Sequence, residues 1–216
     1  MDVLASKGEP KYLAVIGDLR GSRQTADRAR IQERLEAVMA AANRELSGDL
    51  AASLVVTVGD EFQGLLHRPE SFLDLLATYD LAMHDVPARF ALGWGGLSTK
   101  LKPTSIAMDG PCFHAAREAM ERAKEEGRWI TAAGFGDEPD RILNGLFHLI
   151  GSVRAQWTDT QAATVAQMRR TATQKEVAEL RKVATSTVHK ALRGALYAPL
   201  REAETSIALL LRRYGS

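Results

Sequence analysis

Three carboxylates follow two short apolar runs of the chain, at positions where they could hold a metal ion. Asp18 follows the run Tyr12–Gly17, and Asp60 and Glu61 follow the run Ser53–Val58. Both runs are rich in β-formers and predict strands. If the two strands are neighbours, the carboxylates meet at one edge of a sheet. Carboxylate oxygens are donors that Mg²⁺ and Mn²⁺ prefer, often together with phosphates. The pattern therefore predicts a Mg²⁺ or Mn²⁺ site.

The two acids of the second group are not equivalent. Side chains alternate between faces along a strand, so Asp60 and Glu61 should point apart unless the turn bends them together. This favours Asp60 as the ligand and makes Glu61 conditional on the turn. The alternative is that Gly59 and Asp60 only form a hairpin turn, since both residue types suit turns for backbone reasons. Asp18, at the end of a separate strand, favours the metal site.

A glycine-containing loop follows Asp18 and leads into a segment, Ala26 to Leu46, with apolar residues at helical spacing. The loop consists of Leu19, Arg20, Gly21, Ser22 and Arg23. A helix start offers free backbone N–H groups to an anion, and the two arginines would add positive charge. In the alternative interpretation, Ser22 or Thr25 caps the helix and the arginines are solvated.

The segments that would position these residues alternate between strand and helix. The patterns predict strands at 12–17, 53–58, 61–66, 89–94 and 128–133, and helices at 26–46, 69–83 and 111–126. The order βαββαβαβ predicts an α+β fold, in which helices cover one side of a sheet.

Four strings within this part, VIGDLRGSR, VTVGDEFQGLL, FALGWGGL and GPCFHAAREAMERA, resemble the SatD family of bacterial proteins. More remotely, residues 12–133 are similar to the palm-type catalytic domains of class III nucleotide cyclases and GGDEF diguanylate cyclases. That resemblance implies a ferredoxin-like antiparallel sheet. It implies that Asp18 and Asp60, with Glu61 as an extra ligand, hold two divalent metals. It also implies that the Leu19 carbonyl is a ligand and that the N–H groups of residues 20–23 bind the phosphates of a nucleoside triphosphate.

The helix expected after Gly110 departs from the cyclase pattern. Cyclases carry an asparagine and, four residues later, an arginine on this helix, where the chain has His114 and Glu118. Arg117 lies one residue early, about 100° around the helix. His114 and Arg117 are therefore the candidate nucleotide contacts here, although a single helical histidine is more often structural or exposed. These departures favour nucleotide binding over turnover. The rival hypothesis is an active nucleotidyl cyclase or another two-metal phosphoryl-transfer enzyme.

The last part of the chain is basic, while the rest is acidic. From residue 152 onward there are 11 Lys/Arg and 5 Asp/Glu, whereas the remainder has 17 and 22. The string TQKEVAELRKVATSTVHKALRGA resembles a helix-turn-helix, with Ala178 as its small residue, Val183 as its buried turn residue and Val188 as a packing residue. Thr173 and Glu176 have capping-box spacing.

In a helix-turn-helix the second helix enters the DNA major groove. The residues that it would expose to DNA are Thr185, which we also expect to cap that helix, Ser186, Thr187, His189, Lys190 and Arg193. Alternatively, the charge is a solvated face of a helical bundle that serves packing or dimerisation. A homodimer would suit palindromic DNA.

The composition limits the remaining possibilities. No run of 18 apolar residues could span a membrane, and no signal peptide pattern begins the chain. The single cysteine, Cys112, cannot form an internal disulfide, which fits a reducing cytoplasm. The hypothesis is thus a cytoplasmic regulator. Residues 1–150 would form a palm domain that binds metal and nucleotide, and residues 151–216 a small all-α DNA-binding module. An adaptor with neither activity is a third possibility.

Overall fold

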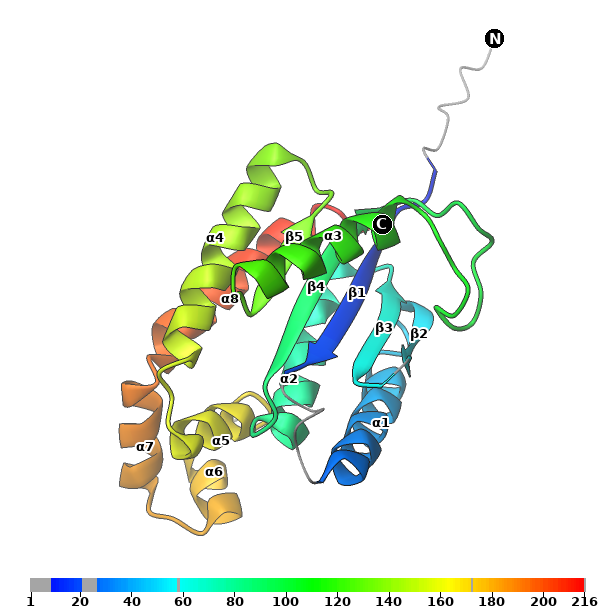
Figure 1. Ribbon diagram of the computed structural model, residues 1–216. Coiled ribbons are helices and arrows are strands. Elements are labelled where there is room, and N and C mark those ends of the chain that lie inside the picture. The colour runs from blue at the N-terminus through cyan, green and yellow to red at the C-terminus, as the bar shows by residue number, and fades with distance from the viewer. Residues whose placement is uncertain (1–8, 21–26, 58, 172, 216) are drawn as a thin grey trace.

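The computed structural model describes residues 9–20, 27–57, 59–171 and 173–215, and its elements follow one another as in Figure 1. The strands are β1 (Tyr12–Leu19), β2 (Leu50–Val56), β3 (Glu61–Leu66), β4 (Ala88–Gly95) and β5 (Ile130–Ala133). The helices are α1 (Arg28–Glu45), the 3₁₀ turn η2 (Pro69–Ser71), α2 (Phe72–Met83), α3 (Pro111–Glu125), α4 (Asp137–Arg154), α5 (Asp159–Met168), α6 (Gln174–Arg181), α7 (Thr185–Gly194) and α8 (Tyr197–Leu211). The predicted α+β class and the predicted βαββαβαβ order are confirmed. None of the helices described is long and apolar enough to cross a membrane.

The five strands form one open sheet with the order β2-β3-β1-β4-β5. The first four strands in the chain pair antiparallel, but β5 pairs parallel to β4. The expectation of a wholly antiparallel sheet is therefore wrong at this edge. The reason is that α3 crosses back over the sheet before β5 begins, and such a crossover produces a parallel pair.

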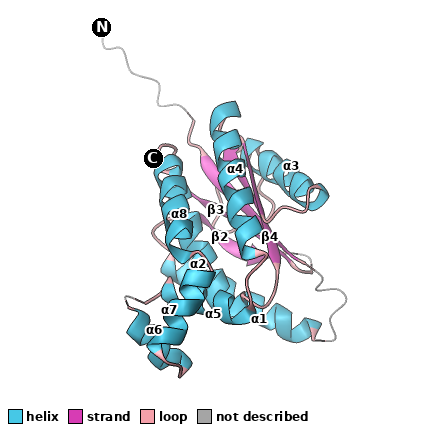
Figure 2. Cartoon of the chain, turned by 90° about the vertical axis from the view of Figure 1, so that its left-hand side faces the viewer, coloured by secondary structure: helices cyan, strands magenta, loops and turns pink. Residues whose placement is uncertain are grey.

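Helices cover both faces of the sheet, so the expectation of helices on one side is also wrong. Leu13 and Val15 of β1 belong to a core shared with α1 and α2, whereas Ala14 and Ile16 belong to a second core beneath α3. Figure 2 shows α3 and α2 on opposite sides of the strands. The uninterrupted apolar run of β1 is typical of a strand that is buried on both faces.

α3 lies very close to the sheet because glycine and small residues line the contact. A Cβ atom on Gly93 of β4 would lie 2.0 Å from the carbonyl oxygen of Cys112 in α3. On the helix side, Ala116 and Ala119 are fully buried. This close approach fixes the position of α3 over the sheet, and therefore the position of its last turn over the end of β1.

The helices after β5 share the main core with the sheet. α4 runs without a break across the boundary that we expected between residues 150 and 151. Val165, Val188 and Ile207 of the later helices belong to the same buried cluster as Leu13 and Phe62 of the sheet. At the end of the chain, the Tyr214 hydroxyl donates to the Phe135 carbonyl, 3.0 Å away, next to the sheet.

A buried ion network joins the two parts of the chain. The Asp80 carboxylate, in α2, accepts two hydrogen bonds from Arg154 at 2.7 and 2.8 Å and one from Arg169 at 2.5 Å. Arg169 also pairs with Glu204 of α8, which in turn pairs with Arg201. The Arg169 side chain is only 3% exposed. α4, the end of α5 and α8 are thus fixed to α2 through charges of which Asp80, Arg169 and Glu204 are almost fully buried.

The network predicts a large loss of stability for Asp80→Asn. This change removes the carboxylate that Arg154 contacts and one of the two that Arg169 contacts, and breaking a buried pair typically costs about 3–5 kcal/mol. Burial alone would raise the pKa of Asp80, but the charges of Arg154 and Arg169 outweigh it and hold the pKa below its ordinary value. The ionised carboxylate therefore stabilises the fold above about pH 4. As the pH falls through the lower pKa of the folded state, this stabilisation is lost.

Urea unfolding at pH 7 and at decreasing pH measures this effect. Asp85→Asn is the matched control, because Asp85 pairs with Arg34 at a site where its side chain is 53% exposed. The control should lose at most about 1 kcal/mol. Equal losses for the two variants would contradict a structural role for the buried network.

Candidate functional site

Two of the predicted acids and one unpredicted arginine form a row across three strands. Asp18 of β1 lies opposite Glu61 of β3 and opposite Arg89 of β4. Residues directly opposite in an antiparallel pair project from the same face of the sheet. Ile16, two residues before Asp18, packs beneath α3, so the row also faces α3. Glu61 therefore shares a face with Asp18, while Asp60 lies in the turn just before β3.

Two basic side chains surround the Asp18 carboxylate. Lys124, in the last turn of α3, places its Nζ 3.6 Å from one carboxylate oxygen, and Arg89 places an Nη 3.9 Å from the other. The Asp18 side chain is only 17% exposed. The register between β1 and β4 brings Arg89 beside Asp18, and the packing of α3 on the sheet brings Lys124 there. No local sequence signal therefore identifies either residue.

Glu61 is held in an environment that disfavours its charge. Burial raises the pKa of the Glu61 carboxyl, and the negative charges of Asp18 and Asp60 raise it further, although Lys124 opposes them. A cation between these carboxylates would relieve the repulsion. Acidic groups that crowd together in this way are common at functional sites and also occur in structural ion clusters.

The turn and the loop at this edge are connected by backbone hydrogen bonds. Gly59 has a positive φ of 81°, as the predicted hairpin turn requires. The Leu19 N–H donates to the Asp60 carbonyl at 3.0 Å, and the Arg20 N–H donates to the Pro87 carbonyl at 2.7 Å. Leu19 is buried, while Arg20 is exposed. The predicted phosphate contacts Gly21, Ser22 and Arg23 lie outside the described residues.

A cavity of about 290 Å³ lies beside this loop, between the start of α1 and the end of α2. Three arginines, Arg20, Arg30 and Arg34, line it. Its two acids are paired, since Asp27 contacts Arg30 and Asp85 contacts Arg34. The lining therefore carries more positive than negative charge, which suits an anionic group.

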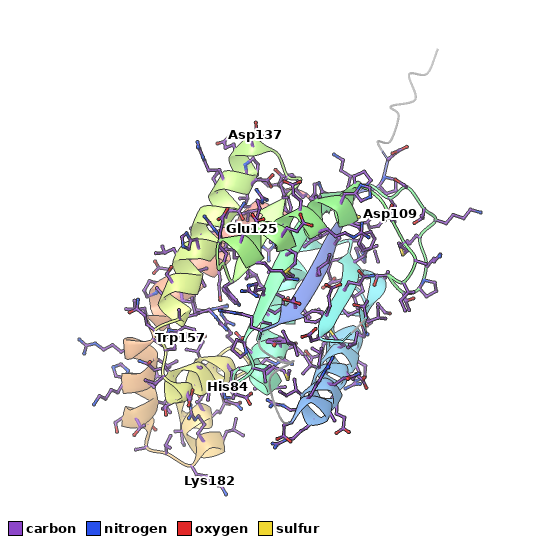
Figure 3. All side chains as sticks on the ribbon, in the orientation of Figure 1. His84, Asp109, Glu125, Asp137, Trp157 and Lys182 are labelled. Carbon is purple, nitrogen blue, oxygen red and sulfur yellow. The ribbon has the colours of Figure 1, made fainter. Side chains whose placement is uncertain are left out.

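His114 and Arg117 do not join the site at Asp18. Both pair with Asp109, His114 at 3.1 Å and Arg117 at 3.3 Å, at the N-terminal end of α3. Ten residues of helix, about 15 Å, separate His114 from Lys124. Figure 3 shows Asp109 and Glu125 at opposite ends of α3. His114 and Arg117 therefore lie towards the other end of α3 from Asp18, because α3 lays its C-terminal end over the end of β1, and their contact with a nucleotide stays a prediction.

The carboxylates at this edge fit a Mg²⁺ site better than a Ca²⁺ or Zn²⁺ site. Among the residues described, no group of three or more His, Cys, Asp or Glu side chains is arranged to hold a metal ion. An all-protein cage of the Ca²⁺ or Zn²⁺ type therefore does not fit. Mg²⁺ needs only one or two carboxylates when water and phosphates complete its shell. Asp18 and Glu61 can supply these carboxylates, and Lys124 and Arg89 can contact phosphate oxygens beside them.

A second candidate surface lies on α7. A three-residue turn, Lys182–Ala184, joins α6 to α7. The capping box of α6 is present, since Thr173 accepts from the N–H of Glu176 and the Glu176 side chain accepts from the N–H of Thr173. Ala178 and Val188 are buried as predicted. All six predicted DNA contacts are exposed: Thr185, Ser186, Thr187, His189, Lys190 and Arg193.

Two details of this pair of helices differ from the prediction. Val183 is 39% exposed rather than buried, because the turn carries it away from the helices. Thr185 is the first residue of α7 and does not cap it, since Ala184 occupies the N-cap position. Lys182 adopts the left-handed conformation, with φ 54° and ψ 45°. This is the position at which helix-turn-helix motifs usually carry glycine, and Figure 3 shows it at the tip of the turn.

The comparisons with known proteins give one family. A family model described as "SatD family" matches residues 12–210, which include the sheet, α3 and the four last helices. A search of curated proteins gave no match.

The strained turn predicts that Lys182→Gly stabilises the protein. A non-glycine residue in the left-handed region costs roughly 1 kcal/mol, and glycine avoids this cost. We expect a gain of about 0.5–1 kcal/mol in urea unfolding. Glu179→Gly, at an exposed position inside α6, is the control and should lose about 1 kcal/mol. If Lys182→Gly is as destabilising as the control, the turn does not have this conformation in solution.

Proposed function

The chain belongs to the SatD family, and we propose that it is a bacterial cytoplasmic regulator with two binding sites. A nucleotide site that depends on a divalent metal lies at the sheet edge around Asp18, and a helix-turn-helix formed by α6 and α7 binds DNA. The observation that carries the proposal is the row formed by Glu61, Asp18 and Arg89, with Lys124 above it.

The topology supports a ferredoxin-like palm. Within residues 12–95 the order is βαββαβ, the four strands are antiparallel in the order β2-β3-β1-β4, and α1 and α2 cover the same face. This is the split βαβ arrangement. It places the ends of β1 and the start of β3 side by side, which is where palm domains hold their acidic residues.

The chemistry of the row supports a metal shared with phosphates. Asp18 and Glu61 would hold Mg²⁺ or Mn²⁺, which neutralises phosphate charge and can activate a hydroxyl group. Asp60 and the Leu19 carbonyl lie at the same edge as further candidate ligands. Lys124, Arg89 and the loop that begins at Arg20 would contact the phosphates.

Turnover by a nucleotidyl-transfer reaction is the second candidate. The observation that favours it is that Lys124 and Arg89 bring two cations to the carboxylates, where a transition state would need them. The distance of His114 and Arg117 from Asp18 speaks against the ribose and transition-state contacts of a cyclase.

The exposed face of α7 supports DNA binding. Its buried residues, Val188, Ala191 and Leu192, pack inward, so the polar residues face solvent together. Lys190 and Arg193 would contact phosphates, while Thr187 and His189 could reach base edges. A homodimer would place two such helices on a palindromic site.

The metal–nucleotide proposal predicts stabilisation by mass action. With ATP, GTP, CTP and UTP each tested with and without Mg²⁺, at least one nucleotide should raise the melting temperature only when Mg²⁺ is present. A ligand at 100 times its dissociation constant contributes about 2.7 kcal/mol. Asp18→Asn and Glu61→Gln should abolish this shift, whereas Asp109→Asn, at the other end of α3, should retain it.

A shift that survives Asp18→Asn, or that needs no metal, would contradict this site. Mass spectrometry of the same incubations with Mn²⁺ detects turnover. A product that forms with the wild-type protein and is lost in Asp18→Asn would establish that the protein is a nucleotidyl-transfer enzyme and not only a nucleotide-binding regulator.

The DNA proposal predicts a change in salt dependence. Each phosphate contact contributes about −0.9 to the slope of log affinity against log salt concentration. Lys190→Ala and Arg193→Ala should each make the slope for duplex DNA shallower by about one, measured by fluorescence polarisation. Lys100→Ala, an exposed change on the loop before α3, should leave the slope unchanged. Equal slopes for all four proteins would exclude α7 as the DNA-binding surface.

A further inference from the structure

An apolar cavity of about 380 Å³ lies at the junction of α7 and α8. In Figure 2, α7 lies directly below α8. The apolar walls of the cavity come from the end of α7, the turn and the first residues of α8: Leu192, Leu196, Tyr197, Ala198 and Pro199. Leu192 is nearly buried, whereas Leu196, Ala198 and Pro199 are exposed to solvent. The apolar surface of the cavity is thus open to a ligand, and its volume is in the range of small-molecule sites.

Leu196 is held in a conformation that leucine rarely adopts. Its backbone lies in the left-handed region, with φ 55° and ψ 40°. Glycine usually occupies such a position after a helix, because a side chain is strained there. The side chain of Leu196 is nevertheless large, apolar and 51% exposed, and it lines the cavity. Neither the strain nor the exposure stabilises the fold, and strained residues are concentrated at sites that bind ligands.

Two polar side chains give the cavity a positive charge. His189 and Arg193 of α7 line it and are exposed. They lie four residues apart, so they project from the same face of the helix. Among the residues that the structure describes, Arg193 forms no ion pair, and none of the described residues that line the cavity is acidic.

The lining therefore suits a molecule with an apolar body and one negative group. A guanidinium matches a carboxylate in both charge and planar geometry. Because the cavity contains a single arginine and is otherwise mostly apolar, a carboxylate with one charge fits it better than a phosphate with two.

We propose that this cavity binds a small carboxylic acid with an apolar body, and that the acid competes with DNA for Arg193. The carboxylate would accept hydrogen bonds from the Arg193 guanidinium, while the apolar part contacts Leu192 and Leu196. Arg193 is also one of the proposed contacts to DNA phosphates, so the acid would weaken DNA binding without a conformational change. The cavity itself does not depend on the proposed function, and only the competition rests on the proposed DNA site.

Calorimetric titration of the full chain without DNA tests the cavity. The probes are octanoate and 3-phenylpropanoate, each compared with its neutral amide. Ala198 is exposed and lines the cavity, so Ala198→Phe fills part of it without removing a buried contact. Ala40→Phe, at an exposed position on α1, is the matched control. Arg193→Ala tests the contact with the carboxylate.

At least one acid should bind about tenfold more tightly than its amide, because a hydrogen bond between charged partners typically contributes this much. Arg193→Ala should make the acid and the amide bind equally. Ala198→Phe should abolish the binding of both, and Ala40→Phe should change neither. The proposal is overturned if neither acid binds, if both acids bind no more tightly than their amides, or if Ala198→Phe binds them as well as the wild-type protein.

The competition is measured by the salt dependence of DNA binding. A saturating acid should weaken the binding of duplex DNA and make the slope of log affinity against log salt concentration shallower by about one, because it replaces one phosphate contact. The amide at the same ionic strength should have no effect, and in Arg193→Ala the acid should change neither affinity nor slope.

The outcomes separate the cavity from the DNA site. If the acid binds but leaves DNA affinity and slope unchanged, the competition is wrong. If the chain binds no duplex DNA, the proposed DNA site and the competition both fail, while the calorimetric result still decides whether the cavity binds the acid.

Discussion

The buried carboxylate of Asp80 is the constraint on which the arrangement of this protein depends. A charge that water does not reach must be paired, and Asp80 is paired by Arg154 and Arg169 from two different parts of the back half. Arg169 then requires Glu204, so α8 is drawn into the same network. Moving α4 or α8 away from α2 would break these pairs and leave buried charge behind. The pairs therefore hold the back helices against the sheet. The last helices are therefore part of the same packed body as the sheet.

The charged residues at the sheet edge around Asp18 are arranged differently from those around Asp80. These charges are partly exposed and crowded, with two carboxylates and two basic side chains around one strand end. Burial raises the pKa of the Glu61 carboxyl there, and the charges of Asp18 and Asp60 add to this effect while Lys124 opposes it. Stable folds usually avoid such crowding, and where it occurs a ligand can supply the missing compensation. The two clusters differ in burial, since the Asp80 and Arg169 side chains are 6% and 3% exposed, whereas Lys124 at the edge is 47% exposed.

A cavity beside Trp129 adjoins the buried network on the α2 face of the sheet. Arg154 belongs to the buried network and to the cavity wall, and its guanidinium lies between the rings of Trp129 and Trp157. Arg154 therefore joins α2, α4 and the segment before α5 at one point, since it pairs with Asp80 and lies against both rings.

The sequence by itself determined the elements and their order, because strand alternation, helical spacing and turn residues are local properties. It placed β1, the Gly59 turn, the capping box of α6 and the exposed face of α7 correctly, and it named Asp18 as a candidate ligand. Tertiary structure alone decided which residues meet. Strand register put Glu61 and Arg89 beside Asp18, and the direction of α3 brought Lys124 there while it carried Arg117 and His114 roughly 10 and 15 Å from Lys124 along the helix. The parallel β5, the second covered face and the pairing of Asp80 with its arginines likewise depend on residues far apart in the sequence, 89 positions for Asp80 and Arg169, and no local pattern encodes such contacts.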